Sequence, residues 1–125
     1  MTINEAITMA DEMKPNMMSP AIKIRFLSEI EGKIHTEILM KHEHTPAEES
    51  CPQYDIDSDP GTEMLVQPPY DMLYVYWIMA QIDHLNQEME KYNNDRSLFE
   101  DAWDNFGDYW TREHMPLTAR RTFRI

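Results

Sequence analysis

The feature that most constrains this chain is a long apolar stripe between Pro69 and Asn93. Apolar residues recur there at i, i+3 and i+4, which is the spacing of one face of an α-helix. The pattern predicts one amphipathic helix of about six turns, which Asn93 and Asn94 bring to an end. A stripe of this kind faces a core, so we expect a helical fold. The stripe consists of Tyr70, Leu73, Tyr74, Trp77, Ile78, Ile82, Leu85, Met89 and Tyr92.

Two further helices are predicted before this stripe. Thr2 and Glu5 match a capping box, in which both side chains satisfy free backbone N–H groups at a helix start. This first helix ends before Pro15, because the residue before a proline avoids the helical region. Ser19 and Pro20 are a favourable N-cap and first position for the second helix. The apolar faces are Ile3, Ala6, Ile7 and Ala10 in the first helix and Ile22, Phe26, Leu27, Ile30, Ile34 and Ile38 in the second.

A fourth helix is predicted after Asn94, with its apolar residues on one side. We interpret Tyr74 and Trp77 of the preceding helix, with the aromatic residues Trp103, Phe106 and Trp110 of this one, as the contact between the two helices. The other side shows Glu100, Asp104 and Asp108 at i, i+4 and i+8, a stripe of like charge that we expect to be an exposed acidic face. The apolar side consists of Leu98, Phe99, Ala102, Trp103, Phe106, Tyr109 and Trp110, and the aromatic contact adds Tyr74 and Trp77.

The second helix is expected to end around residues 41–44. Residues 45–69 are the least regular part of the chain, acidic and with five prolines, and loops of such length are usually functional or disordered. Within it, residues 64–66 fit either a short β segment or an extended docking segment. The predicted fold is all-α: a small four-helix bundle-like domain over residues 1–116, with this loop between the second and third helices, and an extended basic tail over residues 117–125.

The net charge of −12, from 23 acidic and 11 basic residues in 125, excludes two classes of protein. General nucleic-acid binding needs Lys and Arg to neutralise phosphates, and a polybasic anchor needs them against a membrane. The longest apolar run, Leu73–Ala80, is far shorter than the roughly 20 residues of a membrane helix, so we expect no membrane partner. Cys51 is the single cysteine, which excludes an internal disulfide and a multi-cysteine zinc site.

One acidic loop resembles the start of a calcium site. Asp55, Asp57 and Asp59 alternate as the first ligands of a calcium loop do. Pro60 and Val66, however, stand where such a loop needs Gly and Glu. We therefore predict a solvated acidic loop rather than a calcium site.

Zinc and catalysis also find little support. His42, His44 and Cys51 offer three zinc ligands, but no fourth is evident, whereas structural zinc sites fill four positions. Cys51 has no basic neighbour to activate its thiol. No serine lies in a nucleophile elbow, and the helical Glu-x-x-His motif of di-iron proteins is missing. We therefore predict no metal site, no cofactor and no enzymatic activity.

The last 14 residues, Arg112–Ile125, differ in charge from the rest. They hold four arginines and one glutamate, a net +3, whereas the remainder holds 22 acids and 7 bases, a net −15. Residues 121–125 alternate polar and apolar side chains as a strand does, which favours addition to a sheet edge of another protein. The opposite charges also favour head-to-tail self-association, which closes into a ring where the rotation permits. The docking candidates are Arg120, Arg121, Phe123, Arg124 and Ile125, and the acidic face that would meet the arginines on the next subunit is Glu100, Asp104 and Asp108.

Three stretches of the chain, in this order, are similar to the head–tail connector, or adaptor, proteins of tailed phages and prophages of Gram-positive bacteria. They span most of the chain, and none of them is a diagnostic motif by itself. The first is Ala10-Asp11, Pro15-Asn16 and 23–34 (KIRFLSEIEGKI); the second is 62–66 (TEMLV) and 69–74 (PYDMLY); the third is 80–83 (AQID), Tyr92-Asn93-Asn94, Phe99, Phe106, Arg112 and His114-Met115-Pro116.

The resemblance implies a small helical virion protein without catalytic residues. Such a protein joins the portal as a ring, extends the DNA channel and supports attachment of the tail, so the implied partners are the portal, a tail-side completion protein and further copies of the chain. It would occur in the host cytoplasm during assembly and at the head–tail junction of the virion. In related adaptors the C-terminal segment docks on the portal, which agrees with the docking candidates above.

An acidic body also fits the wall of a channel through which DNA passes without specific binding, because like charges do not hold the phosphates. The alternative is a soluble acidic binding or inhibitor module that mimics the charge of DNA and acts on a basic partner. Oligomeric state separates the two interpretations, since such a module works as a monomer or dimer and needs no basic tail.

Overall fold

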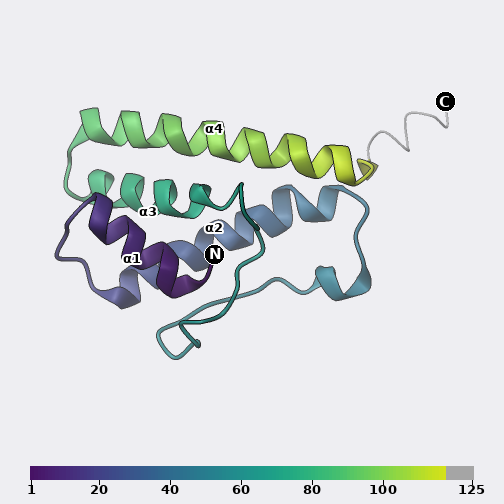
Figure 1. The fold of residues 1–125 in the computed structure, drawn as a ribbon, viewed down its shortest axis with the longest axis horizontal. Helices are drawn as coiled ribbons and strands as arrows, with labels where there is room; N and C mark the ends of the chain where they lie inside the picture. The colour runs from purple at the N-terminus through teal and green to yellow at the C-terminus, as the bar shows by residue number, and fades with distance from the viewer. Residues whose placement is uncertain (118–125) are drawn as a thin grey trace.

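Four helices form in residues 1–117, the part of the chain that the computed structural model describes. They are α1 (Ile3–Met13), α2 (Pro20–Glu37), α3 (Met72–Leu85) and α4 (Met89–Glu113). Two short 3₁₀ helices, η1 (Leu39–Lys41) and η2 (Pro46–Glu49), lie between α2 and α3, and no strand occurs within the described residues. The predicted all-α, bundle-like fold is therefore confirmed, and Figure 1 shows α4 extending along the whole length of the molecule.

The first two helices begin where the capping residues predict. The Thr2 hydroxyl accepts a hydrogen bond from the Glu5 backbone N–H at 3.1 Å, and the Ser19 hydroxyl accepts one from the Ile22 N–H at 3.4 Å. Each bond satisfies one of the backbone donors that a helix start leaves free. The local sequence alone is thus enough to place these two helix starts.

The boundary between α3 and α4 corrects the predicted single helix over residues 69–93. The chain turns at residues 86–88, where Gln87 has a φ of 58°, and Asn93 and Asn94 lie inside α4. The Gln87 and Glu88 N–H groups cap the end of α3 by donating to the His84 and Asp83 carbonyls. The apolar pattern in the sequence runs across this turn because Leu85 and Met89 have the spacing of a helix face. Both side chains are exposed in the structure, so they do not belong to a buried helix face.

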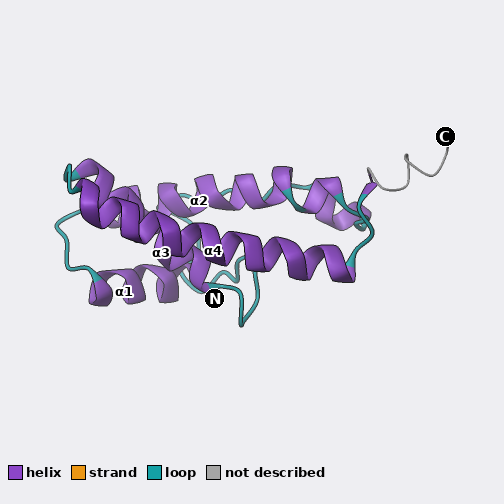
Figure 2. Cartoon of the chain, turned by 90° about the horizontal axis from the view of Figure 1, so that it is seen from above, coloured by secondary structure: helices purple, strands orange, loops and turns teal. Residues whose placement is uncertain are grey.

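α3 is the central helix, and it packs against α1, α2 and α4. Figure 2, viewed from above, shows α1 and α2 on either side of the layer that α3 and α4 form. Nine of the 14 residues of α3 are buried, because three neighbours cover most of its surface. The predicted contact between the third and fourth helices is present, but Trp77 meets Phe99, with ring centroids 5.0 Å apart, and Phe99 was not among the rings expected there.

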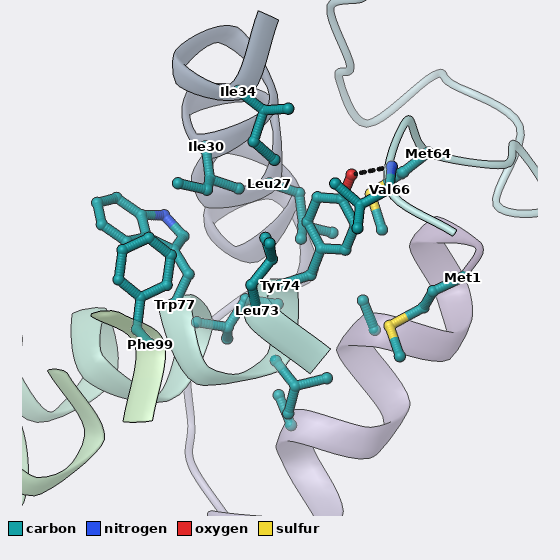
Figure 3. Packing of buried hydrophobic residues seen from close by; sticks show 14 of the residues in the cluster. Met1, Leu27, Ile30, Ile34, Met64, Val66, Leu73, Tyr74, Trp77 and Phe99 are labelled. Carbon is teal, nitrogen blue, oxygen red and sulfur yellow. Dashed lines mark hydrogen bonds between the residues drawn. The ribbon is translucent and has the colours of Figure 1, made fainter. Parts of the chain in front are cut away.

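The core combines the helices with one stretch of the loop (Figure 3). Met64 and Val66 are buried beside α2 and α3, so the docking-segment interpretation of residues 64–66 is the correct one. Two expected core residues, Ile22 and Leu98, are instead exposed, because each lies on the edge of its helix stripe. The buried side chains drawn and labelled in Figure 3 are Met1, Leu27, Ile30, Ile34, Met64, Val66, Leu73, Tyr74, Trp77 and Phe99.

The irregular segment over residues 45–69 returns along α2 and is tied to it at successive points. The His35 Nε2 lies 2.7 Å from the Glu48 carbonyl, and the Tyr54 N–H donates to the Ser28 hydroxyl at 3.0 Å. Further on, residues 62–64 pair with residues 1–3 through bonds such as Met64 N–H to Met1 carbonyl, 3.1 Å. The segment is therefore a packed part of the fold.

Candidate functional site

The predicted acidic face lies on the solvent-exposed surface of α4. Glu100, Asp104 and Asp108 are all exposed, each one helical turn after the last. Arg96 precedes them by one turn, and its Nε donates to Glu100 Oε1 at 3.2 Å. An exposed pair of this kind stabilises a helix only slightly, so this face keeps its charge available for a partner.

A groove of about 380 Å³ runs between α2 and α4, next to this face. Its floor is aromatic: Phe99 packs against Trp77 at 5.0 Å and against Trp103 at 5.8 Å between ring centroids. Trp77 is fixed in place, because its indole N–H donates to the Phe26 carbonyl at 3.0 Å. Trp103 is only half-buried, so part of the aromatic floor faces the groove.

On the rim of the groove, the basic residues lie toward one end and the acidic residues toward the other. Lys33 Nζ lies 5.0 Å from the centroid of the Trp77 ring, and the Arg96 guanidinium lies 5.7 Å from it, both within cation–π range. Glu37 follows Lys33 by one turn on α2, and Glu100 and Asp104 follow Arg96 on α4. Because α2 and α4 run in the same direction (Figure 1), one end of the groove is basic and the end toward the C-terminus of α4 is acidic.

The residues after α4 contact the residues after α2, beyond the acidic end of the groove. Pro116 pairs with His42 in an isolated bridge, and the Glu43 N–H donates to the Met115 carbonyl at 2.9 Å. The His42 ring lies between the Ile38 carbonyl, 2.6 Å away, and the Thr111 hydroxyl, 3.0 Å away. These contacts join the ends of α2 and α4, which sequence reasoning did not predict.

The residues considered as metal ligands have other partners. His44 Nδ1 lies 2.8 Å from the His42 carbonyl. Asp55 and Asp59 accept backbone N–H groups within their own turns, at 2.9 Å each. Among residues 1–117, no three His, Cys, Asp or Glu side chains are grouped to hold a metal ion.

A buried carboxylate that was not predicted from the sequence lies where α2, α3 and the 45–69 segment meet. Glu31 is fully buried and accepts hydrogen bonds from the hydroxyls of Tyr54 and Tyr74, both at 2.6 Å, and from the Leu65 N–H at 2.9 Å. Burial raises the pKa of Glu31, while these donors oppose the shift. The sequence feature that could have revealed Glu31 is its position next to Ile30, where an acidic residue interrupts the apolar stripe of the second helix.

A second acidic cluster joins α1, α3 and α4 at the other end of the bundle. Lys14 Nζ lies 2.8 Å from Asp83 Oδ1 and 3.4 Å from Asp95 Oδ2. Asp83 and Asp95 are buried; within the described residues Oδ2 of Asp83 has no hydrogen-bond partner, and Oδ2 of Asp95 has the ion pair with Lys14 but no hydrogen bond. Burial, together with the neighbouring Asp83 carboxyl, raises the pKa of Asp95 to about 6.

The predicted tail candidates Arg120, Arg121, Phe123, Arg124 and Ile125 lie outside the described residues. In the part that is described, no helix is long and apolar enough to cross a membrane. Comparisons of the chain with protein-family models, with curated proteins and with solved structures gave no match.

Proposed function

We propose that the protein is a structural virion component, a head–tail connector that forms a ring on the portal, extends the DNA channel and supports tail attachment. The observation that carries the proposal is the division of the chain into two parts of opposite charge. The helix α4 exposes Glu100, Asp104 and Asp108, and the arginine-rich end of the chain begins at Arg112 in the last turn of this helix.

The arrangement of the resembling stretches supports the proposal. Glu31 belongs to the first stretch, and Leu65 and Tyr74 belong to the two parts of the second. In the fold these three residues meet in one hydrogen-bonded cluster. The likeness to connector proteins therefore involves residues that hold a single structure together, although Glu31 lies 34 positions from Leu65 and 43 from Tyr74 in the chain.

The charges give the proposed ring its mechanism. A basic segment from one subunit meets the acidic face of the next, so contacts are heterologous and repeat around the ring. Acidic side chains left on the channel wall repel the phosphates and let DNA pass without being held. The protein would act in the host cytoplasm during assembly and remain at the head–tail junction of the virion.

The test is to measure the mass of the full chain by light scattering, alone and mixed with the portal protein encoded in the same genome, and to image the mixture by negative stain. Rings stacked on the portal are expected. A variant with Arg120→Glu and Arg121→Glu should lose them, whereas Arg120→Lys with Arg121→Lys, which keeps the charge, should retain most of the binding.

A stable monomer that ignores the portal would contradict the proposal. It would favour the second candidate, an acidic module that binds a basic partner, for which the net charge of −12 is the supporting observation.

A further inference from the structure

We propose that the groove between α2 and α4 is the receptor for residues 118–125 of a second copy of the chain. This inference deepens the proposed function and rests on it for the ring, but the contact itself is defined by the groove. Phe123 would lie against the aromatic floor, and Arg121 would face the acidic end. The groove has both an apolar and an electrostatic feature that match this segment.

The apolar match is between one aromatic side chain and an aromatic floor. The groove of about 380 Å³ is lined by Phe99 and Trp103 as well as Trp77. Aromatic rings pack favourably in tilted or offset pairs, as the ring pairs already in the groove do. Phe123 is the one aromatic residue after Trp110, so it is the natural occupant of this floor.

The electrostatic match fixes the direction of the segment. In an extended chain alternate residues share a face, which places Arg121 and Phe123 on the same side. The distance between them is about 7 Å, close to the helical turn of about 6 Å that separates Glu100 from Asp104. With Phe123 on the floor, Arg121 lies level with Glu37 and Asp104, and the segment runs antiparallel to α4.

The partner is a second copy because its own copy offers a poor path. After Glu113 the chain pairs with residues 42–43 at the end of the bundle, about 20 Å of helix beyond Glu100. Leu117 is the last described residue, and the six positions from it to Phe123 span at most about 20 Å. That length is used up by the distance alone and leaves none for a reversal of direction.

Charge exchange between two full-length variants tests the contact. The tail variant carries Arg121→Glu, the arginine that faces the groove, and the groove variant carries Glu100→Arg and Asp104→Arg. Light scattering over a concentration series should show each variant alone associating at least about tenfold more weakly than the wild type. An equimolar mixture should recover the wild-type mass, because the reversed tail then meets the reversed groove.

The matched control is Glu12→Arg with Glu29→Arg, which changes the net charge equally at exposed positions on α1 and α2. It should associate as the wild type does. Each variant is first shown to keep the wild-type thermal transition. If the groove variant does not keep it, Glu100→Gln with Asp104→Asn is used in its place.

The apolar part is tested separately with Phe123→Ala. This change should weaken association by about tenfold or more, whereas Thr122→Ala, on the opposite face of an extended segment, should change it little. A wild-type chain that stays monomeric, variants that associate normally, or a mixture that fails to recover would each overturn the inference. Portal binding is measured apart, so a chain that self-associates through the groove but ignores the portal refutes only the proposed function.

Discussion

Two buried acidic sites in this small protein are built in opposite ways. Glu31 accepts three hydrogen bonds from neutral donors, two tyrosine hydroxyls and one backbone N–H. The other site holds two carboxyls, Asp83 and Asp95, against the single ammonium of Lys14. One carboxylate is fully satisfied without a cation, whereas the pair shares one cation and leaves an oxygen of each without a hydrogen bond.

The two sites stabilise different parts of the fold. Glu31 gathers donors from the 45–69 segment and from α3, so it fixes an irregular stretch of chain that has few apolar residues of its own. The Lys14 cluster joins the end of α1 to α3 and α4, and the cost of burying its carboxyls is offset only while the ammonium is present. A satisfied buried network stabilises, while a half-satisfied one is a weak point.

The largest expected effect comes from removing the cation. Lys14→Met leaves two buried carboxyls facing each other, and breaking a buried ion pair from one side costs about 3–5 kcal/mol. Urea unfolding at pH 8 measures the change in free energy of unfolding. Lys91→Met, which removes an exposed lysine paired with Glu88, is the control and should cost about 1 kcal/mol or less. Equal costs for the two would mean that the cluster is not buried as described.

The next effect concerns the satisfied site. Tyr74→Phe removes a hydroxyl that donates to Glu31 and accepts from the Val66 N–H at 2.9 Å, so it leaves two buried groups short of a partner. We expect a loss of about 2–3 kcal/mol in the free energy of unfolding.

Tyr54→Phe is the matched control for that change. Tyr54 donates to the same carboxylate but is only half-buried, so water can replace its hydroxyl and the expected loss is about 1 kcal/mol. A larger loss at Tyr54 than at Tyr74 would reverse the proposed order of importance. Denaturant unfolding of both variants at pH 7 decides the matter.

The effect expected at Asp95 is smaller than those at Lys14 and Tyr74, and it depends on pH. The pKa of Asp95 is raised from its ordinary value to about 6, so the folded state holds this proton more tightly than the unfolded state. The contribution of Asp95 to stability is therefore full below about pH 4 and is lost as the pH rises through about 6. Asp95→Asn stays neutral, so relative to the wild type it should gain roughly 1–2 kcal/mol between pH 4 and pH 7. A pH-independent difference would contradict the assignment.

The sequence predicted the features that depend on neighbours along the chain. The starts of α1 and α2 follow from Thr2 and Ser19, whose side chains cap within three residues. The end of α3 was missed, because the stripe continued through Leu85 and Met89 although both are exposed.

The candidate site was predicted only in part. The acidic face follows from helical spacing, so Glu100, Asp104 and Asp108 were found as exposed residues. The groove beside it depends on side chains of α2, α3 and α4 that meet only in the fold. The partners of Glu31 likewise come from positions 23 to 43 residues away, a separation at which spacing in one sequence carries no signal.

We propose that residues 118–125 are needed for assembly and not for folding, and a variant ending at Leu117 is the test. Its thermal unfolding and its mass by light scattering are compared with those of the full chain of 14.9 kDa. The account predicts the same cooperative transition, within about 4 °C, and a mass that falls to that of one subunit. Loss of the transition, or assembly equal to that of the full chain, would contradict it.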